Sequence, residues 1–390
     1  MDGGEFVQQL INSGPDRRWP VAGSFELTCR CNLRCLPCYI RVKEGTNKAI
    51  EDELSHSEVI RILDELADHG CLGILFTGGE PLIRDDFTAL YMHSKRKGLI
   101  TSLFTNGTLI DPHIADMLAE WPPQTVEITL YGRSEKVYEK VTGVPGSYSR
   151  CFRGIELLLE RKVPLALKAT LITANMHEVW DLKKLAAELG VEFRFDPVIN
   201  PRLDRDKSPL DFRISPEEVL ALELKDAERM NGLKKFVQRF EGPPSAPDDL
   251  YFCQAGLTGF HIDSQGRLSP CLMSRHPSYD LRTGKFREGW ASFLPTVVRK
   301  KRKRVSPCQR CHLHALCDYC PGWAELEGDD PELPVDHLCR LAHLRAHALG
   351  VGCGERNKID DLFNRQHSIK TKVHETADGK SGICSRGSGV

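Results

Sequence analysis

A repeated alternation of short apolar runs and amphipathic segments over residues 24–200 constrains the fold more than any other feature of the sequence. Six apolar runs, each ending in a turn or a polar residue, are typical of buried strands: 23–28, 73–78, 100–107, 125–132, 165–173 and 191–198. This order of strands and helices favours a parallel sheet with helices outside it. Six units are too few for a closed barrel of eight strands. We therefore predict an α/β fold, a partial (β/α)6 barrel of the TIM type.

The segments between these strands carry helix signals of their own. Ser55 and Glu58 have the spacing of a capping box, and Gly70 follows the last apolar position, where helices commonly end. The apolar stripe between them recurs at helical spacing on Val59, Ile62, Leu63 and Leu66. In a barrel of this kind the chemistry takes place at the carboxyl ends of the strands. The segments TCRCNLRC, TGGEP and TNGT all fall at predicted strand ends.

Changes in residue composition and apolar pattern divide the chain into five parts. After the barrel, Ser215, Pro216 and Glu218 predict the start of one more helix, and the proline-rich stretch 241–249 marks a boundary. Turns and cysteines dominate from 251 to about 345, and the residues beyond are polar without an apolar pattern. The predicted parts are an N-terminal extension (1–22), the barrel (23–200), a helical bridge (201–250), a cysteine-rich domain (251–345) and a flexible C-terminal tail (346–390).

Composition excludes several classes of partner. The formal net charge of −1 gives no electrostatic reason to expect nucleic acid or an acidic membrane surface. No apolar run reaches the roughly 18 residues of a membrane span, and the N-terminus lacks the basic start and apolar core of a signal peptide. We expect a cytoplasmic protein. In that reducing compartment its 15 cysteines are expected to be metal ligands or catalytic groups rather than disulfides.

The first cysteine cluster follows the first predicted strand. Cys31, Cys35 and Cys38 have the spacing C-x3-C-x2-C, and Cys29 lies two residues before them. A structural zinc site takes four ligands, commonly in two paired knuckles, and is one alternative. Three thiolates on a single loop suit an iron–sulfur cluster at least as well. A four-iron cluster held by three thiolates keeps one iron open, and an open iron can bind a substrate.

The segment CNLRCLPCY, followed by FTGGEPL and then TNGT, resembles the radical S-adenosylmethionine (SAM) superfamily, and the resemblance covers residues 24–200. It implies a partial (β/α)6 barrel, which agrees with the strand count. It also implies that Cys31, Cys35 and Cys38 ligate a [4Fe–4S] cluster whose open iron binds the amino and carboxylate groups of SAM. The cluster's electron would cleave SAM to a 5′-deoxyadenosyl radical, which abstracts hydrogen from the substrate. Cys29 falls where relatives often have tyrosine, so we expect it not to be a ligand.

The same resemblance implies further contacts to SAM. Gly78 and Gly79 would let the backbone approach its methionine part, and Glu80 would pair with its ammonium group. An ordinary strand-to-helix turn is the alternative for TGGEP. Lys140 stands where relatives often carry arginine for the SAM carboxylate, and it offers a point charge rather than a bidentate fork. The other expected cofactor-binding residues, two for the ribose and one after the last cysteine ligand, are Asn106, Thr129 and Tyr39.

A second group of cysteines follows the bridge. By spacing alone, residues 308–320 suit a zinc knuckle with His312 and His314 as spare ligands, although the gap is short for a zinc ribbon. Behind a radical SAM core, the order of the cysteines resembles the SPASM extension, which carries two auxiliary [4Fe–4S] clusters. By this resemblance the outer cluster takes Cys308, Cys311, Cys317 and Cys339. The inner cluster takes Cys253, Cys271 and Cys320, and its fourth iron is open or ligated by Cys71 or Cys353. Cys151 and Cys384 are expected to be inert thiols.

Three functions follow as hypotheses. In the first, a radical SAM/SPASM enzyme modifies a peptide by cross-linking, epimerisation or oxidation, with a ferredoxin or flavodoxin as electron donor. Because about 23 residues precede the barrel, we expect a leader-binding module to be either a separate chain or absent. The second is a SPASM dehydrogenase for a small molecule or a protein side chain. The third is a non-enzymatic iron–sulfur electron carrier or zinc-binding protein, which has no use for an open iron. The basic run 299–304 is interpreted as a solvated face or a contact for an acidic leader peptide.

Overall fold

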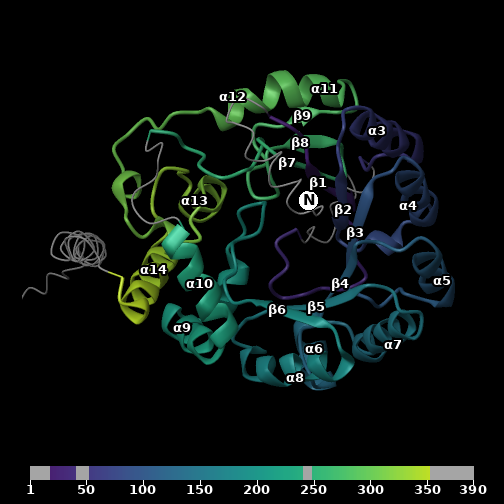
Figure 1. Ribbon diagram of the computed structural model, residues 1–390, viewed down its shortest axis with the longest axis horizontal. Helices are drawn as coiled ribbons and strands as arrows, with labels where there is room; N and C mark the ends of the chain where they lie inside the picture. Colours follow the sequence, from purple (N-terminus) through teal and green to yellow (C-terminus); the bar gives the residue numbers. More distant parts are fainter. Residues whose placement is uncertain (1–17, 41–51, 240–247, 352–390) are drawn as a thin grey trace, which may run out of the picture.

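The computed structural model describes residues 18–40, 52–239 and 248–351. Cys353, Cys384 and most of the predicted C-terminal tail lie outside the described residues. Six parallel strands form one sheet (Figure 1), with the bounds β1 Ala22–Thr28, β2 Gly73–Gly78, β3 Ile100–Thr105, β4 Thr125–Thr129, β5 Leu165–Thr170 and β6 Glu192–Asp196. Each predicted strand is present, and the last four end two or three residues earlier than predicted.

The barrel is open. Its sheet has the order β6-β5-β4-β3-β2-β1-β7-β8-β9, so β6 and β9 lie at two separate edges. The strand β7 (Gly259–Ile262) pairs in parallel with β1, and β8 (Arg267–Ser269) and β9 (Tyr279–Asp280) continue the sheet in antiparallel fashion. The cysteine-rich domain therefore extends the barrel sheet. The sequence did not predict this extension, since strands of two to four residues are too short to show an alternating pattern.

Helices cover the outside of the parallel strands (Figure 1), with the bounds α3 His56–Asp68, α4 Phe87–Arg96, α5 Pro112–Glu120, α6 Glu135–Thr142, α7 Ser147–Glu160 and α8 Val179–Leu189. The predicted capping box is present on α3, where the Ser55 side chain accepts from the Glu58 backbone N–H and the Glu58 carboxylate accepts from the Ser55 N–H. The same reciprocal cap joins Ser215 and Glu218 at the start of α9 (Pro216–Lys225). Both predicted helix starts are confirmed. The bridge continues with α10 (Ala227–Arg239).

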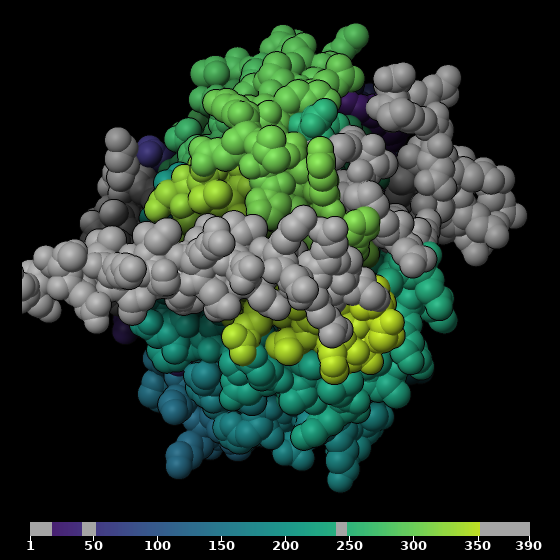
Figure 2. Space-filling view, turned by 90° about the vertical axis from the view of Figure 1, so that its left-hand side faces the viewer, coloured from purple at the N-terminus to yellow at the C-terminus, as the bar shows by residue number. Residues whose placement is uncertain are grey.

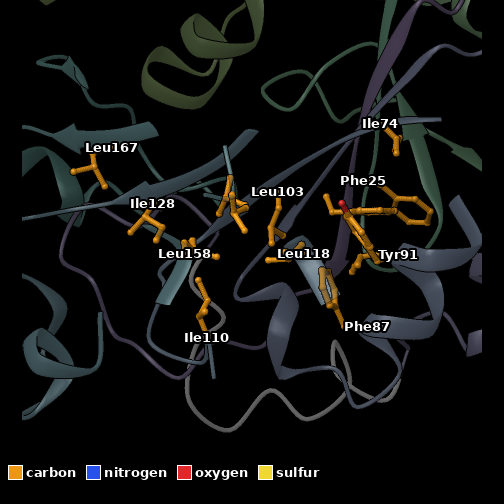
Figure 3. Packing of buried hydrophobic residues seen from close by; sticks show 14 of the residues in the cluster. Phe25, Ile74, Phe87, Tyr91, Leu103, Ile110, Leu118, Ile128, Leu158 and Leu167 are labelled. Atoms are coloured by element: carbon orange, nitrogen blue, oxygen red, sulfur yellow. The ribbon is translucent and has the colours of Figure 1, made fainter. Parts of the chain in front are cut away.

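The hydrophobic core lies between the strands and this outer layer of helices. Figure 3 shows Leu103 of β3 beside Leu118 of α5, and Ile128 of β4 near Leu158 of α7, and all four side chains are fully buried. Burial of each such side chain contributes about 1.5–3 kcal/mol. Because alternate residues of a strand point to opposite faces, this packing turns the intervening residues, such as Glu127, toward the inside of the barrel.

Two buried ion pairs attach the cysteine-rich domain to the rest of the chain. Arg345 of α14 (Asp336–Leu349) donates to the Glu223 carboxylate of α9 at 2.7 and 2.9 Å. Arg275, four residues after Cys271, donates to Glu26 of β1 at 3.0 Å. In Figure 2 the yellow helix α14 lies between the green part of this domain and the teal part of the barrel and bridge. Among the described residues, no helix is long and apolar enough to cross a membrane.

Candidate active site

A cavity of about 450 Å³ lies at the carboxyl ends of the parallel strands. The loop after β1 contributes its cysteines, the TGGE turn after β2 contributes its glycines, and β3 to β6 contribute the residues at their ends. Eight of the residues predicted from the sequence therefore line one space: Cys31, Cys35, Cys38, Tyr39, Gly78, Gly79, Asn106 and Thr129. This convergence follows from the parallel order of the strands, which brings all their carboxyl ends to one side of the barrel.

The thiols of Cys31, Cys35 and Cys38 lie close enough to influence one another. Burial raises the pKa of Cys31 to about 11, and it raises the pKa of Cys35 well above its ordinary value, while the charge of Cys38 adds to both shifts. Cys31 and Cys35 therefore resist losing their protons unless a cation binds the thiolates. The donor set therefore fits an iron–sulfur cluster.

Backbone hydrogen bonds attach the cysteine loop to the end of α6. The backbone N–H of Arg34 donates to the Thr142 carbonyl at 2.8 Å, and the N–H of Leu36 donates to the Val141 carbonyl at 2.9 Å. The N–H of Leu33 points at the Cys31 sulfur at 3.4 Å. The two bonds to α6 hold the backbone of the loop in place, and the three cysteines line the cavity wall.

Gly78 and Gly79 are needed for the packing of two chain segments. A Cβ atom on Gly79 would lie 2.1 Å from the Arg30 carbonyl oxygen, and Gly78 has φ +140° with the Thr28 carbonyl 2.3 Å from the position of a Cβ. Only glycine fits both constraints. The TGGE turn is thereby pressed against the start of the cysteine loop, and the Glu80 N–H donates to the Arg30 carbonyl at 2.8 Å.

Glu80 lies behind this turn and has no exposed surface. Its carboxylate accepts from the Asn106 N–H at 2.7 Å, the Thr105 hydroxyl at 2.8 Å and the Leu82 N–H at 3.1 Å. Burial raises the pKa of Glu80 to about 7, against the lowering effect of these three donors. Glu80 thus ties the end of β2 to the end of β3, and it is not among the residues that line the cavity.

Asn106 connects the third strand to the cysteine loop. Its side-chain amide donates to the side-chain Oδ1 of Asn32 at 2.9 Å and lies 3.8 Å from the Cys31 sulfur, while its own Oδ1 accepts from the Thr108 hydroxyl at 2.6 Å. The segments CNLRC and TNGT, which are separate in sequence, therefore share one hydrogen-bonded network at the cavity wall.

Zinc is disfavoured by the arrangement of the side chains. In the parts of the chain that the structure describes, no three His, Cys, Asp or Glu side chains converge on a position for a single ion. A tetrahedral zinc site requires such convergence. In a four-iron cluster each thiolate binds a different iron, so the thiolates stand farther apart.

Comparison with known proteins decides the family. Residues 25–186, which include the cysteine loop, the TGGE turn and Asn106, match the radical SAM superfamily. Residues 25–186 form a radical SAM domain. The fold of the chain and its C-terminal cysteines resemble those of SPASM-type radical SAM enzymes, and the chain is an enzyme, as its radical SAM relatives are.

Three similar proteins illustrate the range of the family. An AdoMet-dependent heme synthase of Methanosarcina barkeri is 27% identical over 318 residues, which cover 76% of this chain and 90% of that protein. The sporulation killing factor maturation protein SkfB of Bacillus subtilis is 25% identical over 334 residues, covering 85% of this chain and 76% of that protein. Streptococcus suis SuiB bound to the precursor peptide SuiA has a TM-score of 0.64 at 18% identity, covering 86% of this chain and 79% of SuiB. The last likeness is one of fold.

Lys140 does not lie where the other predicted SAM contacts lie. It is exposed on the last turn of α6 and is absent from the cavity wall. Lys168 of β5 lines the cavity instead, with its ammonium 2.8 Å from the Glu127 carboxylate and 3.6 Å from the centre of the Phe104 ring. Burial lowers the pKa of Lys168, against the effect of Glu127. The alternation of side-chain direction along β5 predicts that Lys168 faces the inside of the barrel. It does not predict that the cavity extends as far as Lys168.

Arg229 and Trp323 complete the cavity wall and come from outside the barrel strands. Arg229 of α10 donates to the Phe195 carbonyl at 2.9 Å and pairs with Glu223 at 3.2 Å. Trp323 belongs to α13 (Pro321–Gly328), and its backbone N–H points at the Cys320 sulfur at 3.2 Å. No local sequence signal identifies these residues, since tertiary packing alone brings them to the cavity.

The cysteines of the SPASM-type domain gather in the two predicted sets. Cys308, Cys311, Cys317 and Cys339 line one small cavity together with Tyr319 and His314. Cys253, Cys271 and Cys320 lie within electrostatic reach of one another, and burial raises the pKa of Cys320 to about 12, with the charges of the other two thiols adding to the shift. The zinc alternative groups the cysteines of residues 308–320 in one knuckle. It would therefore place Cys320 with Cys308, Cys311 and Cys317 and leave out Cys339, which is not the grouping seen here.

The remaining described cysteines lie away from both sets. Cys71 precedes β2, at the opposite end of the sheet from the cavity, and its thiol donates to the Gly73 carbonyl at 3.3 Å. This position disfavours Cys71 as the fourth ligand of the inner cluster. Cys151 is fully buried on α7, as expected of an inert thiol. Cys29 does not line the cavity of the other three loop cysteines, and its backbone N–H donates to the Glu53 carboxylate at 2.8 Å, which fits its expected role as a non-ligand.

Proposed function

We propose that this radical SAM enzyme modifies a peptide, by cross-linking, epimerisation or oxidation of a residue bound between its barrel and its SPASM-type domain. The observation that supports the proposal is the extent of the cavity. Its wall begins at the three cysteines of the barrel loop and reaches Asp318 and Trp323 of the SPASM-type domain. A substrate that fills it would contact both domains at once, and an extended peptide has the length and the flexibility to do so.

Different residues of the cavity would bind the cluster, SAM and the substrate. Cys31, Cys35 and Cys38 would hold the cluster, which supplies the electron that cleaves SAM to the 5′-deoxyadenosyl radical. Gly78 and Gly79 line the cavity, where their lack of a side chain would let the methionine part of SAM approach the backbone. Asn106 and Thr129 would bind its ribose. The side of the cavity that carries Arg229 and Trp323 is left for the substrate. An aromatic ring and a guanidinium suit a peptide, which offers both apolar side chains and carbonyl oxygens.

The C-terminal cysteines would hold two auxiliary [4Fe–4S] clusters in the sets described above. The inner set lies next to the substrate side of the cavity, because Trp323 lines the cavity and its N–H also points at the Cys320 sulfur. An electron released by an oxidised substrate could therefore be accepted close to where it is produced. The proposed partners are the peptide substrate and an electron donor of the ferredoxin or flavodoxin type, and a leader-binding protein would be a further partner.

A small-molecule substrate is the second candidate. The likeness to an AdoMet-dependent heme synthase extends over 90% of that protein, which is a longer match than the similarity of the barrel alone. A SPASM dehydrogenase for a small molecule would use the same three cysteines and the same TGGE turn. The two candidates differ only in what occupies the side of the cavity with Arg229 and Trp323.

The test is an anaerobic incubation of the reconstituted enzyme with SAM, dithionite and the short peptides encoded beside its gene. Mass spectrometry should show a loss of two hydrogens, or the gain of one deuterium in heavy water, together with formation of 5′-deoxyadenosine. The Cys35→Ala variant is the matched control and should change no peptide. Unchanged peptides, with 5′-deoxyadenosine formed in response to an iron porphyrin instead, would overturn the peptide proposal.

A further inference from the structure

Two partly buried polar side chains near the outer cysteine set have nitrogen atoms without any hydrogen-bond partner. These atoms are Nε and Nη1 of Arg302 and Nδ1 of His314, and each is shielded from solvent. A buried donor without a partner costs about 1–3 kcal/mol, and more when it is charged. Such atoms in a native fold therefore indicate a ligand that they bind.

Arg302 differs from its neighbours in the basic run 299–304. The other residues of this run are exposed, whereas Arg302 is partly buried. The backbone fixes it in place, because its N–H donates to the Asp248 carbonyl at 2.8 Å and the next N–H, of Lys303, donates to the Glu332 carboxylate at 3.0 Å. The run is therefore not one uniform solvated face, and one of its arginines points into the domain.

The guanidinium of Arg302 lies beside residues of the outer cavity. It lies within hydrogen-bonding reach of the Tyr319 hydroxyl and within electrostatic reach of the Cys308 sulfur. Cys308 and Tyr319 both line the cavity that the four cysteines share. Arg302 is always charged and has only donors, so it cannot serve as a ligand to iron.

His314 approaches the same cavity from the other side of the loop, on the short helix His314–Leu316. Four cysteines already supply one thiolate for each iron of a [4Fe–4S] cluster. Neither His314 nor Arg302 is therefore needed as a ligand. What the cavity lacks is an acceptor for their nitrogen atoms, and the sulfurs of a bound cluster and its thiolates are acceptors.

We propose that Arg302 and His314 are positioning residues that donate hydrogen bonds to the sulfurs of the outer auxiliary cluster, and that Arg302 raises the reduction potential of this cluster. The inference rests on the two-cluster assignment made under the proposed function. Reduction adds one negative charge to the cluster, and a nearby cation with N–H donors stabilises that charge. A higher reduction potential makes the outer cluster a better electron acceptor than it would be without Arg302.

The test is a redox titration followed by electron paramagnetic resonance, in a full-length background in which Cys31, Cys35 and Cys38 are alanine, so that only the auxiliary clusters contribute. Arg302→Met should move the midpoint potential of one cluster to more negative values. Lys303→Met is the matched control, because it removes the same charge from the next, exposed residue, and it should leave both potentials unchanged. His314→Leu should shift the same cluster in the same direction.

Equal midpoint potentials for Arg302→Met and Lys303→Met would overturn the inference. If Arg302→Met loses the iron of one cluster instead, Arg302→Lys is the deciding variant, because it keeps the positive charge. Retention of that iron in Arg302→Lys supports the contact between residue 302 and the cluster. Loss of that iron in Arg302→Lys, together with an unchanged midpoint potential in His314→Leu, contradicts it. The titration uses no substrate. A potential shift without any modified peptide would therefore refute only the peptide function, and a modified peptide without a shift would refute only this inference.

Discussion

Glu80 allows a quantitative test of how the site is built. The carboxylate is fully buried and accepts three hydrogen bonds, and its pKa is raised to about 7 by burial. The folded protein thus holds the Glu80 proton more tightly than the unfolded chain does, where the pKa is near 4.5. The stabilisation linked to this proton is fully present below the unfolded pKa, and it is lost as the pH rises through the folded value.

The magnitude follows from the two pKa values. At about 1.4 kcal/mol per unit, the free energy of unfolding should fall by about 2 kcal/mol between pH 5.5 and pH 8 because of Glu80 alone. Glu80→Gln keeps the shape of the side chain and removes the titration. Its amide must face one of the three donors, which costs about 1–3 kcal/mol, but this cost is the same at every pH.

The assay is urea unfolding of wild type and Glu80→Gln at several pH values, followed by circular dichroism. The difference in unfolding free energy between the two proteins should shift by about 2 kcal/mol across this range in favour of the variant as the pH rises. The subtraction removes the titration of all other groups. A difference that stays flat from pH 5.5 to pH 8 would refute the reasoning that burial outweighs the three donors.

Three further predictions concern the clusters and the domain contact. Anaerobic reconstitution should give about ten to twelve irons per chain, the content of three clusters; about four irons with one zinc would contradict the auxiliary assignment. The inner cluster, with Cys253, Cys271 and Cys320, should have one iron that binds added thiol and changes its paramagnetic spectrum, whereas a fourth protein sulfur at about 2.3 Å in X-ray absorption would exclude an open iron. Arg275→Met should destabilise the chain by about 3–5 kcal/mol because it leaves Glu26 buried without its partner, and adding Glu26→Gln should recover part of this loss in urea unfolding, which a purely local packing defect at Arg275 would not allow.

Much of the fold could be predicted because its signals are local. Each buried strand is an apolar run, α3 and α9 have capping boxes, and parallel strands necessarily bring their ends together. The cysteine loop, the TGGE turn and Asn106 therefore converge as predicted. The short strands β7 to β9 could not be predicted, because their pairing with β1 depends on long-range contacts rather than on any pattern of their own.

The parts of the site that the sequence missed depend on tertiary packing. Arg229 and Trp323 reach the cavity from helices in the bridge and in the SPASM-type domain, so their distance in sequence from the cysteine loop hides their role. The Lys140 assignment transferred a position from relatives, but that position is exposed here and Lys168 lines the cavity. Burial of one arginine within a basic run, as at Arg302, leaves no trace in the sequence at all.

The central claim is that the three cysteines after β1 form the site of SAM cleavage. Its most direct test is the amount of 5′-deoxyadenosine formed by the anaerobically reconstituted enzyme with SAM and dithionite, compared with a variant in which Cys31, Cys35 and Cys38 are alanine. We predict that wild type forms 5′-deoxyadenosine, and that the variant forms none while it loses about four irons per chain and keeps the auxiliary clusters. Formation of 5′-deoxyadenosine by the variant at the wild-type rate would contradict the claim.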